Sequence, residues 1–336
     1  MSSPILVTGA AGFIGFHVAR RLLEQGKAVI GLDNLNAYYD PALKRARLAI
    51  LAQQARFRFE QADVADRERV ADLFAAHRIS HVVHLAAQAG VRHSLSDPSA
   101  YGQANLLGFL NILEACRHSA CRHLLYASSS SVYGANTRVP FRVTDNVDHP
   151  LSLYGATKKA NELMAHAYAH LFAIPATGLR FFTVYGPWYR PDMAMWLFTE
   201  AILSGKPIRL FNHGRMRRDF TYIDDVTEAV VRLLDVPPAA DAHWDAATPN
   251  PATSRAPWRV YNIGNNTPVE ITHLVGLLET VLGRAAQREF VEMQPGDVEE
   301  TCADIADLEA AVGFRPKTPI EEGVRKFVAW YRGYMS

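Results

Sequence analysis

The sequence lacks the features that mark membrane, secreted and nucleic-acid-binding proteins. No window of the 336 residues approaches the roughly 18–20 unbroken apolar residues of a membrane span. The first residues carry no basic segment and reach a glycine before an apolar stretch develops, so we expect no secretory signal. Basic and acidic residues nearly balance, 35 against 34, which argues against the strongly positive field of a general nucleic-acid binder.

Cysteine is also scarce. The three cysteines, Cys116, Cys121 and Cys302, have the spacing of neither a disulfide framework nor a metal site. The 13 histidines show no metal-ligand spacing either. The composition therefore predicts a cytoplasmic protein that has no metal and acts on neither a membrane nor a nucleic acid.

The first half of the chain alternates short apolar runs with longer amphipathic ones. Strands that alternate with helices imply right-handed crossovers and a parallel sheet covered on both faces. We therefore predict an α/β fold with a doubly wound parallel sheet of the Rossmann type. The predicted strands are Pro4–Thr8, Lys27–Asp33, Phe57–Asp63, His81–Ala86 and His123–Ser128, and the predicted helices are Phe13–Gln25, Asp66–His77 and Pro98–Arg117.

The first predicted strand runs into a glycine-rich turn, Gly9–Gly15, and a helix follows at once. Glycines let the backbone approach a pyrophosphate, whose charge then lies at the positive helix N-terminus. The spacing is Gly-x-x-Gly-x-x-Gly rather than the dinucleotide fingerprint, so the flanking strand and helix carry the argument. Asp33 ends the second predicted strand, where a carboxylate binds the adenosine ribose and repels a 2′-phosphate. The turn thus predicts NAD rather than NADP; the alternative is a turn that only packs helix against strand.

Residues at the ends of later strands fit the same site. We expect Asp63 and Val64 to meet the adenine, and the small residues of Leu85–Ala87 to lie beside the cofactor. Asn105 is expected to orient a ribose or a backbone group. Taken singly, each of these residues is more typical of a structural role.

The sequence pattern changes after about residue 183, where prolines and mixed short elements become frequent. We expect residues 1–182 to form the NAD-binding domain, and residues 183–336 to form mainly a smaller α/β part that binds the substrate, with some segments returning to the first domain. The stretch Val236–Pro257 predicts a long surface loop. The last two helices are expected near Asp304–Val312 and Pro319–Tyr334.

Tyr154 and Lys158 are spaced to share one face of a predicted helix. The phenol of a tyrosine ordinarily has a pKa near 10. A nearby lysine, together with the positive nicotinamide, would lower that pKa and make the phenol a usable base near neutrality. A bare Tyr-x-x-x-Lys pair is common by chance, but here a strand that ends in Ser128–Ser131 brings hydroxyls to the same crevice. This combination predicts an active site.

These features together resemble the extended short-chain dehydrogenases/reductases that act on nucleotide sugars. The glycine turn, Val132-Tyr133-Gly134 after the serines, the Tyr154/Lys158 pair and Arg218-Asp219-Phe220 carry that resemblance. The chain is most similar to the UDP-glucuronate 4-epimerases of this group, in segments that span nearly its whole length. Those segments are Asp33–Pro41, Ala86–Arg92, Asp148–Tyr154, Thr183–Met193 and Met293–Val298.

The resemblance implies reversible C4 epimerisation of UDP-glucuronate to UDP-galacturonate through a 4-keto intermediate, with a bound NAD that is regenerated. It implies Ser129 as the catalytic hydroxyl, Tyr154 as the base and Lys158 as its activator and a nicotinamide-ribose ligand. The choice among Ser129, Ser130 and Ser131 stays open because the serines run together. It also implies a homodimer formed through the two long helices around residues 98–117 and 153–172.

The residues before Val132-Tyr133-Gly134 favour epimerisation over related chemistry. Relatives that dehydrate carry an acidic pair there, and those that decarboxylate usually carry a glutamate. Ser130 and Ser131 cannot act as carboxylate acids or bases. A UDP-glucose or UDP-N-acetylglucosamine 4-epimerase is the alternative, and a non-catalytic NAD-binding scaffold is a more distant one.

A 4-keto uronate is a β-keto acid, so its carboxylate must be held in an orientation that discourages loss of carbon dioxide. Arg190 and Thr183 are the candidates, although Arg190 could instead be a surface or diphosphate-binding residue. Arg218 is the expected diphosphate anchor, and Arg92 is expected to contact either cofactor or substrate. The predicted substrate residues are Arg92, Ser129, Ser130, Ser131, Tyr154, Thr183, Arg190 and Arg218. The predicted cofactor residues are Gly9, Gly12, Phe13, Ile14, Gly15, Asp33, Asn34, Asn36, Asp63, Val64, Leu85, Ala86, Ala87, Gln88, Asn105, Ala127, Tyr154, Lys158 and Phe181.

Overall fold

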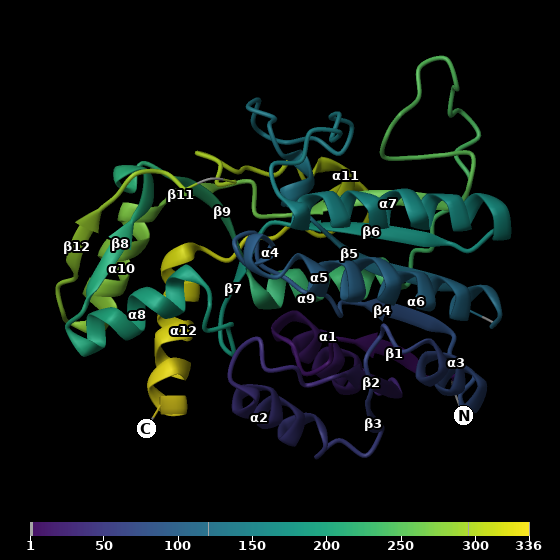
Figure 1. The fold of residues 1–336 in the computed structure, drawn as a ribbon, viewed down its shortest axis with the longest axis horizontal. Helices are drawn as coiled ribbons and strands as arrows, with labels where there is room; N and C mark the ends of the chain where they lie inside the picture. Colours follow the sequence, from purple (N-terminus) through teal and green to yellow (C-terminus); the bar gives the residue numbers. More distant parts are fainter. Residues whose placement is uncertain (1–2, 120, 295, 336) are drawn as a thin grey trace.

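The structure, a computed structural model, describes residues 3–119, 121–294 and 296–335. Its centre is a seven-stranded sheet with the order β10-β6-β5-β4-β1-β2-β3, in which every neighbouring pair is parallel (Figure 1). The strand order reverses beside β1, which confirms the predicted doubly wound sheet. The strands are β1 (Ile5–Thr8), β2 (Val29–Asp33), β3 (Phe57–Gln61), β4 (His81–His84), β5 (His123–Ser129), β6 (Ala176–Phe181) and β10 (Trp258–Ile263).

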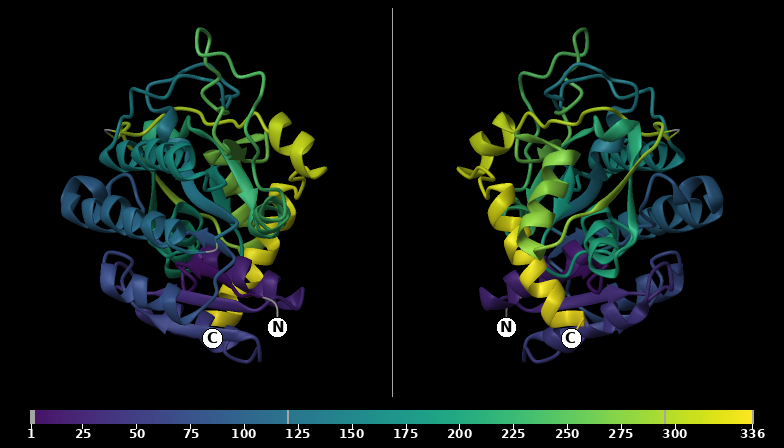
Figure 2. Two further views of the ribbon diagram at one scale, coloured as in Figure 1. Left: turned by 90° about the vertical axis from the view of Figure 1, so that its right-hand side faces the viewer. Right: turned by 90° about the vertical axis from the view of Figure 1, so that its left-hand side faces the viewer.

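Helices cover both faces of this sheet (Figure 2). On one face α1 (Phe13–Glu24) packs against α9 (Ile223–Leu234); on the other α6 (Gly108–Arg117) packs against both α3 (Arg67–Ala76) and α7 (Leu153–Phe172). The two faces have separate apolar cores, and successive residues of β1, Leu6 and Val7, belong to different ones. Alternation along a strand produces this division, and a sheet covered on both sides needs apolar residues in both directions.

Two helical segments differ from the prediction. The expected helix 98–117 is interrupted: α5 (Pro98–Tyr101) continues as a π-helical segment, η1 (Gly102–Leu107), before α6 begins. The helix α2 (Pro41–Leu51) was not predicted, although its start is marked by Asp40, whose side chain accepts a hydrogen bond from the Ala42 amide. No pattern of period 3.6 reveals a π insertion.

The remaining elements form a smaller α/β part to the left of the sheet in Figure 1. It contains a three-stranded sheet of order β11-β9-β7 and a parallel pair, β12 and β8, against which helices pack. Its elements are β7 (Thr183–Tyr185), α8 (Ala194–Ser204), β8 (Pro207–Leu210), β9 (Arg217–Tyr222), β11 (Pro268–Glu270), α10 (Ile271–Leu282), β12 (Gln287–Phe290) and α12 (Ile320–Met335). The last helix therefore lies within one residue of the expected 319–334.

The chain crosses between the two parts more than once. Strand β10 joins the edge of the large sheet beside β6, and α11 (Ala306–Val312) packs on β10. Between α9 and β10 the chain has no helix or strand over residues 236–257, which confirms the predicted loop, visible at the upper right of Figure 1. The boundary after residue 182 stays a prediction.

Among the described residues no helix is both long and apolar enough to cross a membrane. The same part of the chain contains no group of three or more histidine, cysteine or acidic side chains that could hold a metal ion.

Candidate active site

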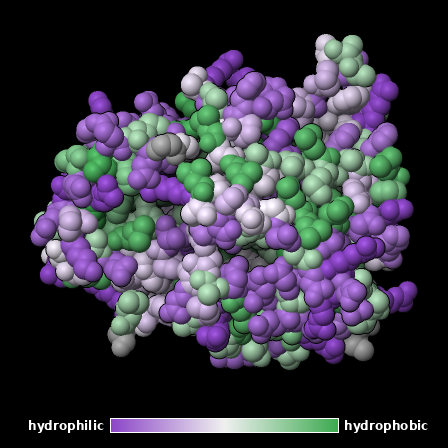
Figure 3. All heavy atoms as spheres, in the orientation of Figure 1, coloured by the Kyte–Doolittle hydropathy of each residue, from purple (hydrophilic) through white to green (hydrophobic). Residues whose placement is uncertain are grey.

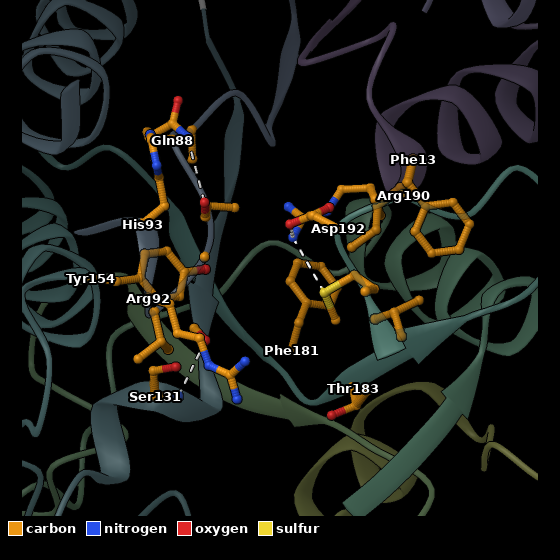
Figure 4. A pocket seen from close by; sticks show the side chains of 18 of the residues that line it. Phe13, Gln88, Arg92, His93, Ser131, Tyr154, Phe181, Thr183, Arg190 and Asp192 are labelled. Atoms are coloured by element: carbon orange, nitrogen blue, oxygen red, sulfur yellow. Dashed lines mark hydrogen bonds and ion pairs between the residues drawn. The ribbon is translucent and has the colours of Figure 1, made fainter. Parts of the chain in front are cut away.

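A cavity of about 960 Å³ lies at the carboxyl ends of the parallel strands, between the large sheet and the smaller part (Figure 4). In open α/β sheets this is where ligands bind, because the strand order reverses there. All the predicted site residues except Asn105 line this cavity. Predicted residues that span positions 9 to 218 thus line one continuous cavity, and their individual roles stay predictions.

The glycine turn forms a tight cradle at one end of the cavity. Gly9 has φ +71°, a conformation that residues with a side chain rarely adopt, and a Cβ there would lie 2.8 Å from the amide nitrogen of Ala86. A Cβ on Gly15 would collide with the carbonyl oxygen of Gly9. The helix α1 begins directly after Gly12, with no side chain that caps its N-terminus. The turn therefore has the space and the free amides that a pyrophosphate needs, and it fits the predicted dinucleotide.

Asp33 is held rigidly at the end of β2. It is 7% exposed, and its two carboxylate oxygens accept hydrogen bonds from the amides of Ala11 (3.2 Å) and Leu35 (2.9 Å). The ammonium of Lys44 lies 3.9 Å from the same carboxylate and donates to Asn36 at 2.8 Å. This buried carboxylate lines the cavity where the adenosine ribose of NAD is expected, so the residues present fit the cofactor.

Asn105 orients a backbone group, which is one of the two roles expected of it from the sequence. It is 1% exposed and lies in the π-helical segment η1. Its amide accepts a hydrogen bond from the Gln88 amide at 2.9 Å, and donates to the Gln88 carbonyl at 3.0 Å and to the Thr157 hydroxyl at 3.1 Å. All its polar atoms are thereby used within the protein. Asn105 positions the backbone of the wall residue Gln88 and does not face the cavity.

Ser129, Tyr154 and Lys158 converge from two elements. Ser129 ends β5, and Tyr154 and Lys158 lie in the first turns of α7, which begins after the N-cap Ser152. The Lys158 ammonium donates to the carbonyl of Ala127 at 2.9 Å and lies 6.0 Å from the centre of the Tyr154 ring. The Ser129 hydroxyl lies near the Tyr154 phenol and favours its ionised form. This proximity favours Ser129 over its serine neighbours, and the choice among the three stays a prediction.

The electrostatics of these groups are dominated by burial. Burial raises the pKa of Tyr154 above its usual value; the hydrogen bond from Ser129 and the charge of Arg190 act in the opposite direction. Burial also lowers the pKa of Lys158 to about 8. Within the protein itself, therefore, the groups that favour the phenolate of Tyr154 are Ser129 and Arg190. The lowering expected from Lys158 together with the nicotinamide stays a prediction.

Arg190 is part of a polar cluster across the cavity from Ser131, as Figure 4 shows. Its Nη2 donates to Asp192 at 3.0 Å and to the sulfur of Met193 at 3.4 Å. The phenol of Tyr38 donates to the same oxygen of Asp192 at 3.0 Å. The second oxygen, Oδ1 of Asp192, is buried and has no hydrogen-bond partner among the described residues. Arg190 is thus a cation at the cavity wall, held by a carboxylate of the chain.

Two further arginines, Arg92 and Arg218, line the cavity, and they lie close enough for the charge of Arg92 to lower the pKa of Arg218. The guanidinium of Arg92 lies 4.4 Å from the centre of the Phe211 ring and forms an ion pair with Asp297 at 3.0 Å. Arg218 donates to the carbonyls of Arg217 and Glu299, and burial lowers its pKa. Arg92 and Arg218 therefore lie at one end of the cavity, well placed for an anionic ligand.

Several residues that line the cavity were not assigned roles from the sequence. Most of them lie inside the segments that carry the family resemblance, but Lys44, His93 and Phe211 lie outside those segments, and no spacing rule relates any of them to the catalytic pair. Pro295, in the last of those segments, lies outside the described residues. The unassigned residues are Tyr38, Tyr39, Lys44, His93, Asp192, Met193, Phe211 and Asp297.

Comparison with known proteins agrees with this geometry. The family model described as "NAD dependent epimerase/dehydratase family" matches residues 5–264. A probable UDP-glucuronate 4-epimerase of Rhizobium meliloti (strain 1021) is 50% identical over 333 residues, which cover 97% of this chain and 96% of that protein.

Solved structures are similar over almost the whole chain. The UDP-glucuronic acid 4-epimerase of Bacillus cereus, in complex with UDP-glucuronic acid and NAD, has a TM-score of 0.86 and 32% identity, covering 98% of this chain and 99% of that one. The UDP-glucose 4-epimerase of Thermotoga maritima, with UDP-glucose, has a TM-score of 0.85 and 30% identity, covering 99% and 100%. The chain belongs to the NAD-dependent epimerase/dehydratase family.

Proposed function

We propose that this protein is a UDP-glucuronate 4-epimerase that interconverts UDP-glucuronate and UDP-galacturonate with a bound NAD. The observation that carries the proposal is that Ser129, Tyr154 and Lys158 line one cavity whose wall also holds the Arg190 cation. The relatives named above support the same substrate, because the Bacillus cereus protein is a UDP-glucuronic acid 4-epimerase crystallised with UDP-glucuronic acid.

The cofactor site follows from the cradle and the strand ends. The amides after Gly12 would bind the pyrophosphate, and Asp33 would accept hydrogen bonds from the adenosine ribose. Lys158, held by the carbonyl of Ala127, would bind the nicotinamide ribose. When bound, NAD supplies a hydride acceptor that returns the hydride at the end of each cycle.

The chain's own residues handle the proton of the sugar 4-hydroxyl. The phenol of Tyr154 takes that proton, and Ser129 hydrogen-bonds the sugar oxygen and the phenol. The positive charge of Arg190 favours the phenolate that this step requires. Return of the hydride to the opposite face of the 4-keto sugar, with return of the proton from Tyr154, completes the inversion at C4.

The carboxylate of the sugar needs hydrogen-bond donors while the sugar is in its 4-keto form. Arg190 can grip a carboxylate through two parallel hydrogen bonds, and Thr183 lines the same cavity. Ser130 and Ser131 provide hydroxyls at the wall but no acid or base for dehydration or decarboxylation. This arrangement favours epimerisation of a uronate without loss of carbon dioxide.

A UDP-glucose 4-epimerase is the second candidate. The Thermotoga maritima structure, at nearly the same TM-score, is a UDP-glucose 4-epimerase with UDP-glucose. The Arg190 cation favours the uronate, because a neutral hydroxymethyl group would leave its charge without a ligand partner.

The test is to incubate the purified protein with UDP-glucuronate, without added NAD, and to follow the sugar protons by NMR. UDP-galacturonate without UDP-pentose is the expected product. UDP-pentose would mean decarboxylation and contradict the argument from Ser130 and Ser131. No reaction with UDP-glucuronate, but turnover of UDP-glucose, would establish the second candidate.

We also propose a homodimer formed through α6 and α7. Figure 3 shows apolar atoms gathered over these two helices. Leu163 is 59% exposed and Leu171 66%, and Leu107, Leu110 and Phe172 are exposed near them. A patch of this kind typically marks an interface. Sedimentation of the wild type should give a dimer and that of Leu163→Glu a monomer; a monomeric wild type would refute the proposal.

A cytoplasmic location is the remaining part of the proposal. The cysteines Cys116, Cys121 and Cys302 are all free thiols, which suits a reducing compartment. Fractionation of cells that express the protein from its own gene tests this location, and recovery outside the cytoplasmic fraction would contradict it.

A further inference from the structure

A buried ion pair lies directly behind the serine turn, and the reaction proposed above does not use it. Arg180 on β6 and Glu162 on α7 have side chains that are 0% and 2% exposed. Nε and Nη2 of Arg180 donate to the two carboxylate oxygens of Glu162 at 2.8 and 2.9 Å. Burial raises the pKa of Glu162, but the charge and hydrogen bonds of Arg180 outweigh that effect and keep it below its usual value. The pair is therefore charged and bidentate inside the protein.

The remaining polar atoms of the pair reach the segments that carry the active site. Ser128, the residue before the catalytic serine, donates to Oε1 of Glu162 at 2.7 Å. Nη1 of Arg180 donates to the phenol of Tyr133 at 3.1 Å. Tyr133 ends the short turn η2 (Ser130–Tyr133), and its phenol in turn donates to the side chain of Asn262 on β10 at 2.6 Å.

The position of Glu162 along α7 connects this network to Tyr154, the proposed base. Tyr154, Lys158 and Glu162 follow one another at intervals of four residues, so they share one face of the helix. Arg180 is the register partner of Ser128 across β5 and β6. The network thus joins the end of β5, the serine turn and the catalytic face of α7, which are the three pieces whose relative position sets the contact between the serine hydroxyl and the phenol.

We propose that the Arg180–Glu162 pair, with Ser128 and Tyr133, positions the serine turn against α7 and so sets the distance between the Ser129 hydroxyl and the Tyr154 phenol. These four are positioning residues, since none of them is needed to touch the reacting atoms. The inference rests on the proposed epimerase function. A small displacement of a reacting group lowers the rate of the chemical step while leaving distant binding contacts in place.

A displaced serine turn has a second chemical consequence. The 4-keto uronate would persist longer before the hydride returns, so a fraction would lose carbon dioxide. In that side reaction the bond between C5 and the carboxylate carbon breaks, carbon dioxide leaves, and a solvent proton takes its place on C5. Return of the hydride then gives UDP-pentose, which reports on positioning and not on stability.

The experiment uses two mild variants and a matched control. Ser128→Ala and Tyr133→Phe each remove one hydroxyl from the network and leave the ion pair intact. Thr177→Val is the control: Thr177 lies on the same strand β6, and its hydroxyl shares a 2.8 Å hydrogen bond with His123 at the opposite end of β5. For each protein we would measure thermal unfolding, bound NAD, kcat and KM for UDP-glucuronate, and the UDP-pentose fraction by NMR.

Ser128→Ala and Tyr133→Phe should each lower kcat about tenfold and produce some UDP-pentose, with KM within about twofold of the wild type and NAD retained. Thr177→Val should keep the wild-type kcat and product even if its unfolding temperature falls by as much as those of the two test variants. If all three variants lose kcat in proportion to stability, or if the two test variants match the control, the positioning role is wrong. A wild type that does not convert UDP-glucuronate would refute the proposed function, and the inference would fall with it.

Discussion

The two ends of the active-site cavity hold their polar groups in different ways. At the cofactor end Asp33 accepts from two backbone amides and Lys158 donates to a backbone carbonyl, with Lys44 as a further side-chain partner of Asp33. At the substrate end Arg190 contacts Asp192 and Arg92 contacts Asp297, both carboxylates of the chain, whereas Arg218 donates to backbone carbonyls. Backbone partners cannot leave, whereas an arginine can exchange one carboxylate for an anionic ligand. This contrast suits an enzyme that retains its cofactor and releases its sugar nucleotide in every cycle.

The largest loss of activity is expected for a change at Tyr154, where the cofactor end and the substrate end of the cavity meet. Tyr154→Phe removes the phenol hydroxyl that exchanges the proton, so kcat should fall by roughly 10³-fold. Bound NAD, measured after denaturation of the purified protein, should be unchanged because the phenylalanine keeps the ring. Activity within about tenfold of the wild type would remove Tyr154 from the role of base.

Gly15→Ala should damage the cofactor end selectively. The new Cβ would collide with the carbonyl oxygen of Gly9, so the cradle must open and bound NAD should be lost. Gly276→Ala is the matched control, because Gly276 lies within α10 and a Cβ there meets nothing within 4 Å. That variant should gain about 1 kcal/mol in the free energy of unfolding and keep NAD. Retention of NAD by Gly15→Ala would show that the cradle is not tight.

Arg190→Leu should damage the substrate end selectively. Loss of the cation should lower kcat/KM for UDP-glucuronate by about 100-fold, while calorimetry should find the affinity for UDP unchanged. Arg217→Leu provides the control, since Arg217 is exposed on β9 and pairs with Glu300. Unchanged kinetics for Arg190→Leu would exclude it from the site, and a weakened affinity for UDP would assign it to the diphosphate instead.

Lowering the pH should reduce the free energy of unfolding, because His84, beside the cofactor end, resists protonation in the folded protein. Burial, and next the charge of Lys158, lower the pKa of His84 from 6.5 to about 3. Between these two values the unfolded chain binds a proton that the folded protein does not, so stability is lost as the pH falls below 6.5. The slope approaches 1.4 kcal/mol per pH unit for one histidine. Urea unfolding between pH 7 and pH 5 should show a smaller loss for His84→Asn than for the wild type; equal losses would mean that His84 titrates normally.

Local sequence patterns were enough to predict the alternating strands and helices of the large sheet. The alternation of apolar strands with amphipathic helices, the glycine turn after β1 and the i, i+4 spacing of Tyr154 and Lys158 depend on residues close together in the chain. Each has a fixed geometric consequence, because strand and helix periods are properties of the backbone. The π-helical segment escaped because it has no characteristic period, whereas α2 was missed although Asp40 marks its start.

The partners of the site side chains were decided only by the tertiary structure. Sequence spacing could not show that the amide of Asn105 is used by Gln88, that Tyr38 and Arg190 meet at Asp192, or that Arg180 grips Glu162 behind the serine turn. These contacts join groups up to 154 residues apart. Which atoms meet over such separations depends on how the order of the strands in the sheet brings their ends together. It also depends on which polar groups are buried away from water and therefore need a partner within the protein. Neither is a property of any local stretch of sequence.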